Sequence, residues 1–188
     1  MQCADACEHE LNWTANIDNK DKLMDFTDDH FNPDPSLFDT NFVCPKGPSK
    51  DVLLYIVGEA PGKDDVEGGL SFLGQAGKVL DRAISESNAA SAKIRFFNAI
   101  PYRPVTGDMQ TRAPGPDEIK KYSSFVMTDI EKVRPKVIIL TGESAMAAFG
   151  IDMAVDEARV ISFKHNGIPV LVTHHPSHVL QAVKSNSS

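Results

Sequence analysis

The sequence predicts an α/β protein, a three-layer α/β/α sandwich around a four-stranded parallel sheet. From residue 51 onward, nearly continuous apolar runs alternate with segments of helical spacing. Strands that are apolar throughout are typical of parallel sheets covered on both faces. The predicted strands lie near residues 52–58, 94–99, 137–141 and 169–173.

Segments with helical spacing separate these strands. In the stretch "GQAGKVLDRAISES", helical spacing places five apolar residues on one side of a predicted helix: Ala76, Val79, Leu80, Ala83 and Ile84. The stretch "GPDEIKKYSSFVMTDIEKVRP" opens with a proline and acidic residues and ends with basic ones, as helices do. "ESAMAAFG" predicts a further helix that Gly150 closes.

Length and composition fit one domain with an extension. The chain has 188 residues, of which 41% are hydrophobic, enough for a proper core. The first 50 residues are rich in Asp, Asn and Pro. We therefore expect residues 1–50 to form an acidic N-terminal extension, packed on the core or loosely attached to it, and residues 51–188 to form the main domain.

Apolar run length, cysteine content and net charge indicate the compartment and the partners to expect for the protein. Apolar runs such as "LLYIV" are too short to span a bilayer, and the first residues lack an apolar signal core, so we expect neither a membrane partner nor secretion. Three cysteines, an odd count, favour a reducing cytoplasm. The net charge of −7 weakens non-specific binding to nucleic acid. Nothing in the sequence demands more than a monomer.

Polar residues and glycines follow each predicted strand. The strand ends carry Gly58-Glu59-Ala60-Pro61-Gly62, then Asn98, then Thr141-Gly142, then His174-His175-Pro176-Ser177. In open parallel sheets, ligands bind in the crevice outside the carboxyl ends of the strands. These stretches therefore predict a binding or catalytic site on one rim of the sheet.

Taken singly, these stretches are each compatible with more than one role. "GEAPG" fits a simple turn or a phosphate loop, although it lacks the lysine and hydroxyl residue of a Walker motif. Asn98 could cap a helix or bond a turn. His174, His175 and His178 could bind zinc, but no nearby cysteine or carboxylate supports them in sequence. Cys3, Cys7 and His9 lie at a terminus, where chains fray, and we predict no metal.

Three stretches together resemble a known family. "VGEAPGKDDVEGGLSFLGQAGKVLD", "NAIPYRP" and "THHPSHVL", in this order, are similar to motifs of the uracil-DNA glycosylase superfamily. The similarity is closest to the family 4 branch, which normally carries a four-cysteine iron–sulfur cluster. It runs from about residue 50 to residue 180. The fold of that family, a four-stranded parallel sheet between helices, agrees with the predicted sheet.

The resemblance implies a hydrolase of DNA repair. Such an enzyme hydrolyses the N-glycosidic bond of uracil, or of a related modified pyrimidine, in DNA after flipping the base out of the stack. No lysine stands at an obvious nucleophile position on the rim, so we expect a monofunctional glycosylase. A non-catalytic DNA-binding or protein-docking module that kept the fold stays an alternative, as does a nucleotide-phosphate binding protein.

The resemblance also assigns roles to single residues. Glu59 matches the acid that positions the attacking water and favours the cationic sugar, and His175 matches the histidine that stabilises negative charge on the leaving base. Phe72 matches the aromatic residue on which uracil stacks, and Asn98 the amide that reads it. His174 either contacts phosphate or faces solvent, as does His178. The remaining predicted contacts are Gly58 and Ala60 to the base, Pro61, Gly62, Pro176 and Ser177 to the DNA backbone, and Val179 and Leu180 as a wedge.

The sequence departs from the family at the cluster ligands. Tyr102 stands where one cysteine is expected, and Tyr122 or a nearby serine stands where another is expected. Four thiolates hold such a cluster, and the chain has three cysteines. We therefore expect no iron–sulfur cluster and aromatic packing in its place. Leu70 and Ser71 stand where an arginine and a proline are usual. These changes suggest a divergent bacterial or viral member, which would act in the host cytoplasm if viral.

Overall fold

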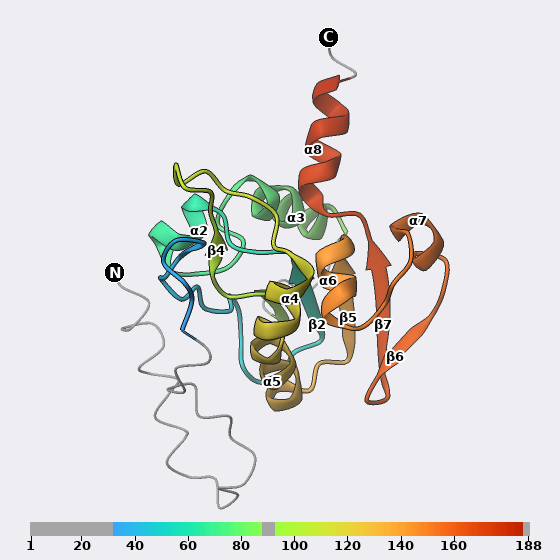
Figure 1. Ribbon diagram of the computed structural model, residues 1–188. Helices are drawn as coiled ribbons and strands as arrows, with labels where there is room; N and C mark the ends of the chain where they lie inside the picture. Colours follow the sequence, from blue (N-terminus) through green and yellow to red (C-terminus); the bar gives the residue numbers. More distant parts are fainter. Residues whose placement is uncertain (1–31, 88–92, 186–188) are drawn as a thin grey trace, which may run out of the picture.

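The computed structural model describes residues 32–87 and 93–185, with side chains as far as residue 180. Its central sheet has the strand order β3-β2-β5-β7-β6 (Figure 1). Four strands are parallel, as predicted: β2 (Leu54–Gly58), β3 (Ile94–Asn98), β5 (Val137–Thr141) and β7 (Ile168–Thr173). Almost every residue of β2 and β3 is buried, which explains why both are mainly apolar, although β3 also buries Arg95 and Asn98.

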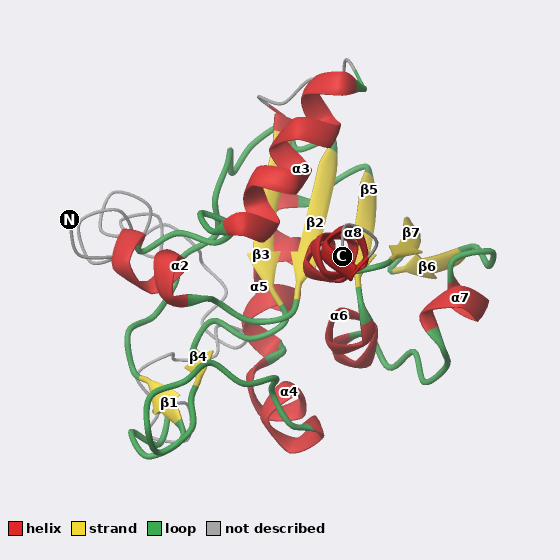
Figure 2. Ribbon diagram, turned by 90° about the horizontal axis from the view of Figure 1, so that it is seen from above, coloured by secondary structure: helices red, strands yellow, loops and turns green. Residues whose placement is uncertain are grey.

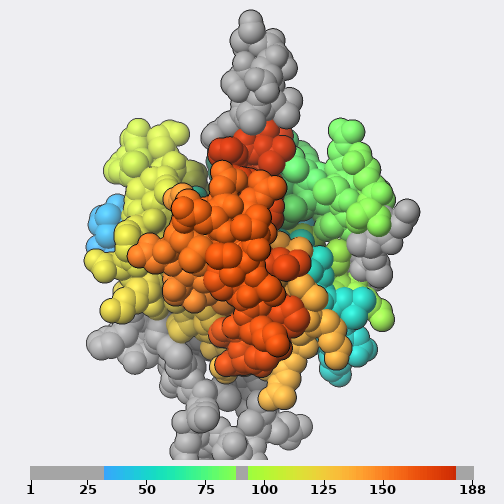
Figure 3. Space-filling model, turned by 90° about the vertical axis from the view of Figure 1, so that its right-hand side faces the viewer, coloured from blue at the N-terminus to red at the C-terminus, as the bar shows by residue number. Residues whose placement is uncertain are grey.

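The prediction of four strands is wrong, because the sheet has a fifth strand at its edge. β6 (Phe163–His165) pairs antiparallel with β7 and makes the sheet five-stranded and mixed. A tight turn joins the two strands at Asn166 and Gly167, whose φ angles are 48° and 84°. Asn-Gly is the usual sequence of such a turn. The β6 strand before it has only three residues, which are too few to show the alternation by which a strand is recognised in a sequence. Figure 3 looks onto this edge of the molecule.

Helices cover both faces of the sheet, so the three-layer sandwich is confirmed (Figure 2). One face carries α4 (Pro116–Tyr122), α5 (Ser124–Val133), α6 (Glu143–Ala148) and the short α7 (Val155–Ala158). The other face carries α3 (Gln75–Glu86). Beyond the carboxyl ends of the strands lie α2 (Lys63–Gly68) and α8 (Pro176–Ser185), and α8 contacts α3. Within the described ranges, no helix has the length and apolar character needed to cross a membrane.

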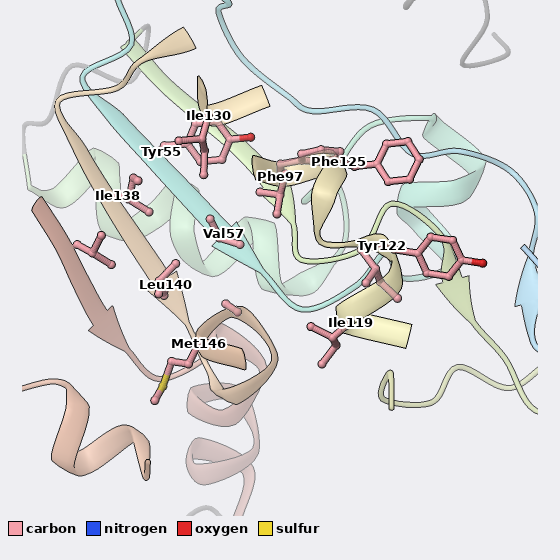
Figure 4. Close-up of a cluster of buried hydrophobic side chains, with 14 of the residues drawn as sticks. Tyr55, Val57, Phe97, Ile119, Tyr122, Phe125, Ile130, Ile138, Leu140 and Met146 are labelled. Carbon is pink, nitrogen blue, oxygen red and sulfur yellow. The ribbon is translucent and has the colours of Figure 1, made fainter. Parts of the chain in front are cut away.

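The main core lies between the sheet and helices α4 to α7. Tyr55, Val57, Ile138 and Leu140 from the strands are no more than 1% exposed, and Figure 4 shows them facing the helical side chains. A smaller cluster on the other face joins Ile56, Phe72, Ile94 and Phe96 and packs against α3. Burial of such side chains removes apolar area from water and supplies most of the driving force for folding.

Residues 32–50 lie against the core. β1 (Phe38–Asp39) pairs with β4 (Arg103–Pro104), and Val43 is fully buried. The predicted division of the chain at residue 50 stays a prediction, since residues 1–31 lie outside the described residues.

A buried ion pair ties this segment to the sheet and to α5. Arg95 of β3 is 1% exposed and binds Asp129 of α5 through two hydrogen bonds of 2.7 and 2.9 Å. The guanidinium also donates to the carbonyls of Gly47 and Pro48, each at 3.0 Å. Tyr55 donates to the same carboxylate at 2.5 Å, and burial together with the Asp129 charge raises the pKa of this phenol well above its usual range.

We predict that Asp129→Asn destabilises the fold by about 3–5 kcal/mol, because it removes the carboxylate charge that faces the buried guanidinium of Arg95. The measurement is equilibrium unfolding in guanidinium chloride. Glu86→Gln is the matched control, since it removes one carboxylate from the exposed Arg82–Glu86 pair and should shift the midpoint far less. Equal midpoints for the Asp129 variant and the parent would show that the pair is not needed.

Candidate active site

The carboxyl ends of the parallel strands meet at one edge of the sheet, as predicted. Gly58 pairs with Asn98 across β2 and β3, and Thr141 pairs with Thr173 across β5 and β7. A pocket of about 390 Å³ opens at this edge. Its lining includes these predicted site residues: Glu59, Ala60, Pro61, Gly62, Phe72, Asn98, His175 and Ser177.

Four predicted residues do not line the pocket. Gly58 is buried behind it, where a Cβ would come within 2.5 Å of both Asn98 Oδ1 and the Phe72 ring. Pro176 is buried and starts α8. Val179, which is 47% exposed, and Leu180, which is half-buried, follow on the same helix.

Glu59 is held by a hydroxyl from another strand–helix junction. Ser144, in the first turn of α6, donates a hydrogen bond of 2.8 Å to Glu59 Oε2. Ser144 is 9% exposed, so this contact is shielded from solvent. Sequence reasoning missed Ser144, although "TGES" follows directly after β5 and could have signalled it.

His175 is a largely buried imidazole between two loops. Gly142, with φ 85°, allows it to approach, since a Cβ there would lie 3.1 Å from His175 Cβ. Burial lowers the pKa of His175, and the charge of Glu59 opposes this shift only in part. The N–H of Ser177 donates to His175 Nδ1 at 3.3 Å. In the neutral ring the proton therefore lies on Nε2, which makes Nε2 a hydrogen-bond donor.

The other histidines of "THHPSHVL" form a separate group. His174 contacts Asp156 at 3.1 Å, and its ring stacks on His178 with centroids 5.1 Å apart. The pairing with His174 lowers the pKa of Asp156. Within the part of the chain that the structure describes, no three His, Cys, Asp or Glu side chains are placed to hold a metal ion. Cys3, Cys7 and His9 lie outside the described residues.

Phe72 reaches the pocket on a strained backbone. Its φ of 60° is in the left-handed region, which costs free energy for a residue with a Cβ. Lys46 donates to its carbonyl at 3.1 Å, and Gly77 of α3 lies so close that a Cβ there would be 1.9 Å from the same oxygen. Phe72 is 4% exposed and packs on Phe96, so it belongs both to the smaller core cluster and to the pocket lining.

Asp65, a residue that sequence reasoning missed, fixes the loop around Phe72. Its Oδ1 accepts hydrogen bonds from the N–H groups of Leu73 at 2.7 Å and Gly74 at 3.2 Å. Its Oδ2 accepts from the N–H of Gly62 at 3.1 Å. Asp65 is 7% exposed. One buried carboxylate thus joins the start of α2 to the segment that presents Phe72.

A further loop contributes residues that no sequence motif indicated. Thr111 and Arg112 line the pocket opposite the strand ends. Arg112 binds Glu118 of α4 at 2.6 Å and donates to the carbonyl of Val105 at 3.1 Å. These contacts hold the 105–112 segment against α4, and they connect residues that are well separated from the three motifs.

The predicted aromatic packing is present around Tyr102 and Tyr122, the two positions where the resemblance implies cysteine ligands. The rings of Tyr102 and Tyr122 meet edge to face with centroids 5.4 Å apart, and Phe38 and Phe42 pack on them at 5.4 and 5.7 Å. Burial raises the pKa of Tyr102 to about 12, so its phenol stays neutral. Neutral, closely packed rings do not fit an iron–sulfur cluster, which needs thiolates.

A larger hollow of about 610 Å³ lies at the opposite end of the sheet. It runs between the end of α5 and the β6–β7 turn, and Arg134, Lys136 and Asn166 line it with exposed side chains. Ligands of open parallel sheets bind at the carboxyl ends of the strands. The smaller pocket, where half-buried Glu59 and largely buried His175 meet, is therefore the candidate active site.

Comparisons with known proteins identify the family. The family model "Uracil DNA glycosylase superfamily" matches residues 44–188. A type-4 uracil-DNA glycosylase of Thermotoga maritima is 31% identical over 150 residues, covering 76% of this chain and 73% of that protein. The type-4 enzymes of Archaeoglobus fulgidus and Saccharolobus solfataricus are 32% and 38% identical over 106 residues, covering 56% of this chain and about half of each protein. Because the family model spans more than half of the sequence, the chain belongs to the uracil-DNA glycosylase superfamily.

Proposed function

We propose that this protein is a monofunctional DNA glycosylase, which hydrolyses the N-glycosidic bond of uracil, or of a related modified pyrimidine, in DNA. The observation that carries the proposal is the meeting of a carboxylate, an imidazole, an amide and an aromatic ring in one pocket, from Glu59, His175, Asn98 and Phe72. The relatives named type-4 uracil-DNA glycosylase support this substrate.

The pocket suits a base that has left the duplex. Its volume of about 390 Å³ leaves room for one pyrimidine and part of its sugar. A pyrimidine inside a duplex cannot reach a buried residue such as Asn98, which is 3% exposed, so the nucleotide must flip out. Phe72 offers a ring for stacking, and Val179 and Leu180 on α8 fill the gap in the duplex.

The two ionisable groups take complementary roles. Glu59 orients the attacking water and offsets the positive charge that develops on the sugar, with Ser144 holding one carboxylate oxygen and fixing the side chain. His175, neutral and protonated at Nε2, donates to uracil O2 as negative charge gathers on the leaving base. Water then completes the hydrolysis, and the products are free base and an abasic sugar.

A strand-cleaving step needs an amine nucleophile. The lysine among the residues that line the pocket is Lys63, which is exposed in the first turn of α2. Its side chain is 73% exposed and pairs with Glu67 at 3.7 Å, whereas nucleophilic lysines are activated in desolvated pockets. The hydroxyl of Ser177 holds a backbone phosphate, and Pro61 and Gly62 contact the DNA backbone beside it. The functional unit is a monomer.

The catalytic pair can be tested on a uracil-containing oligonucleotide. Glu59→Gln and His175→Ala should each lower the single-turnover rate by about 100-fold or more while DNA binding is kept, because charge stabilisation in the transition state is lost. Strand breaks that appear only after alkali would indicate a monofunctional enzyme.

His165→Ala is the control for this assay. His165 lies in the β6–β7 hairpin at the other end of the sheet, and its loss should leave the rate unchanged. If the parent protein binds uracil DNA but leaves it intact, the non-catalytic alternative holds instead. If Glu59→Gln excises at the parental rate, the carboxylate is not the group that positions water.

Another prediction concerns the cofactor. We propose that the protein carries no iron–sulfur cluster, because Tyr102 and Tyr122 form a packed aromatic pair where thiolates would be required. Protein purified without oxygen should be colourless and contain iron far below one atom per chain by elemental analysis. Stoichiometric iron with a visible charge-transfer band would contradict this proposal.

The carboxylate that fixes the Phe72 loop gives a further prediction. In Asp65→Asn the amide nitrogen faces the N–H of Gly62 or those of Leu73 and Gly74, and two donors cannot bond. We expect a loss of about 1–3 kcal/mol in stability and weaker uracil-DNA binding, since Phe72 is no longer held.

Glu67→Gln is the matched control on the same helix, because it changes an exposed carboxylate that pairs with the exposed Lys63. Unfolding midpoints and the KM and kcat of each variant are compared. A change confined to the unfolding midpoint, with KM and kcat intact, would mean that Asp65 supports the fold and does not position Phe72.

A further inference from the structure

Ser71 lies directly against the amide that faces the base. Ser71 is fully buried, and Asn98 Nδ2 donates to its hydroxyl oxygen at 3.5 Å. The Ser71 hydroxyl in turn donates to the carbonyl of Cys44 at 3.0 Å. The three groups form a short chain of hydrogen bonds that runs from the 42–48 segment to the floor of the pocket.

The direction of this chain follows from counting protons. A serine hydroxyl has one proton, and here Cys44 O accepts it, so Ser71 can only accept from Asn98. Asn98 must therefore turn its NH2 group toward Ser71 and its oxygen away, toward Gly58 and the ring of Phe72. In the opposite orientation two oxygen atoms would face each other, unless the hydroxyl left Cys44.

The fixed orientation leaves a defined pattern for a base. One N–H of the Asn98 amide is used by Ser71, and the second N–H and Oδ1 remain. Uracil presents an acceptor at O4 and a donor at N3, which match this pair. Cytosine presents a donor at N4 and an acceptor at N3, which match only the reversed amide.

We propose that Ser71 is a positioning residue that selects uracil over cytosine by holding the Asn98 amide in one orientation. The inference rests on the proposed glycosylase function and deepens it. The backbone N–H of Ser71 also donates to Cys44 O, at 2.9 Å, so two groups of this residue are tied to the 42–48 segment.

The test uses oligonucleotides that contain 2′-fluoro-deoxyuridine or 2′-fluoro-deoxycytidine, in which the fluorine slows cleavage and allows binding to be measured. The parent protein should prefer the uracil analogue in fluorescence anisotropy. In Ser71→Ala the amide can turn over, and the ratio of the two dissociation constants should fall by about threefold to tenfold, the value of one neutral hydrogen bond. Ser71→Thr keeps the hydroxyl and should restore the preference.

Ser87→Ala is the control, because it removes a hydroxyl that bonds a helix carbonyl outside the pocket. Ser71→Ala should still fold, since its N–H keeps the bond to Cys44 O. An unchanged ratio in Ser71→Ala, or an equal loss of both affinities, would overturn the selecting role. If the parent protein neither excises uracil nor prefers its analogue, the proposed function itself fails, and the two failures are thereby distinguished.

Discussion

The buried Arg95–Asp129 pair is the contact on which the arrangement of the site depends. It joins β3 to α5, and the remaining donors of the guanidinium hold the carbonyls of Gly47 and Pro48. The segment fixed in this way carries Lys46, which bonds the carbonyl of Phe72, and Cys44, whose carbonyl accepts from Ser71. This buried ion pair thus fixes residues 44–48, which bond the carbonyl of Phe72 and the hydroxyl of Ser71.

The pocket residues depend on two different kinds of support. Asn98 ends strand β3, and Glu59 and His175 come shortly after β2 and β7, so the strand register brings them to one edge. Phe72 does not stand at the end of a strand and adopts a strained backbone, so its loop needs several fixed contacts, from Asp65 above all. The sheet therefore places the proposed catalytic groups, while a network of side-chain hydrogen bonds places the ring proposed to stack on the base.

This difference explains what the sequence could predict. Apolar runs revealed the four parallel strands, and reading off their ends brought Glu59, Asn98 and His175 together without a structure. The sequence did not reveal β6, because its three residues are too few to show the alternating pattern of a strand. Asp65 and Arg95 were missed because each acts through a partner or a loop whose approach only the folded chain defines, whereas Ser144 could have been found from its place directly after β5. The resemblance to a family supplied Phe72, which periodicity alone would have assigned to the core, where it also lies.

The aromatic cluster links the proposed loss of the iron–sulfur cluster to the pocket. Tyr102 and Tyr122 come from segments on either side of the 105–112 loop, and their rings pack with Phe38. The guanidinium of Arg112 lies over the Phe38 ring at 5.7 Å and also lines the pocket. Ring packing can therefore hold this loop in place by apolar burial, without metal ligation. Because each tyrosine packs on the other, exchange of either one alone would lose this packing without restoring four thiolates.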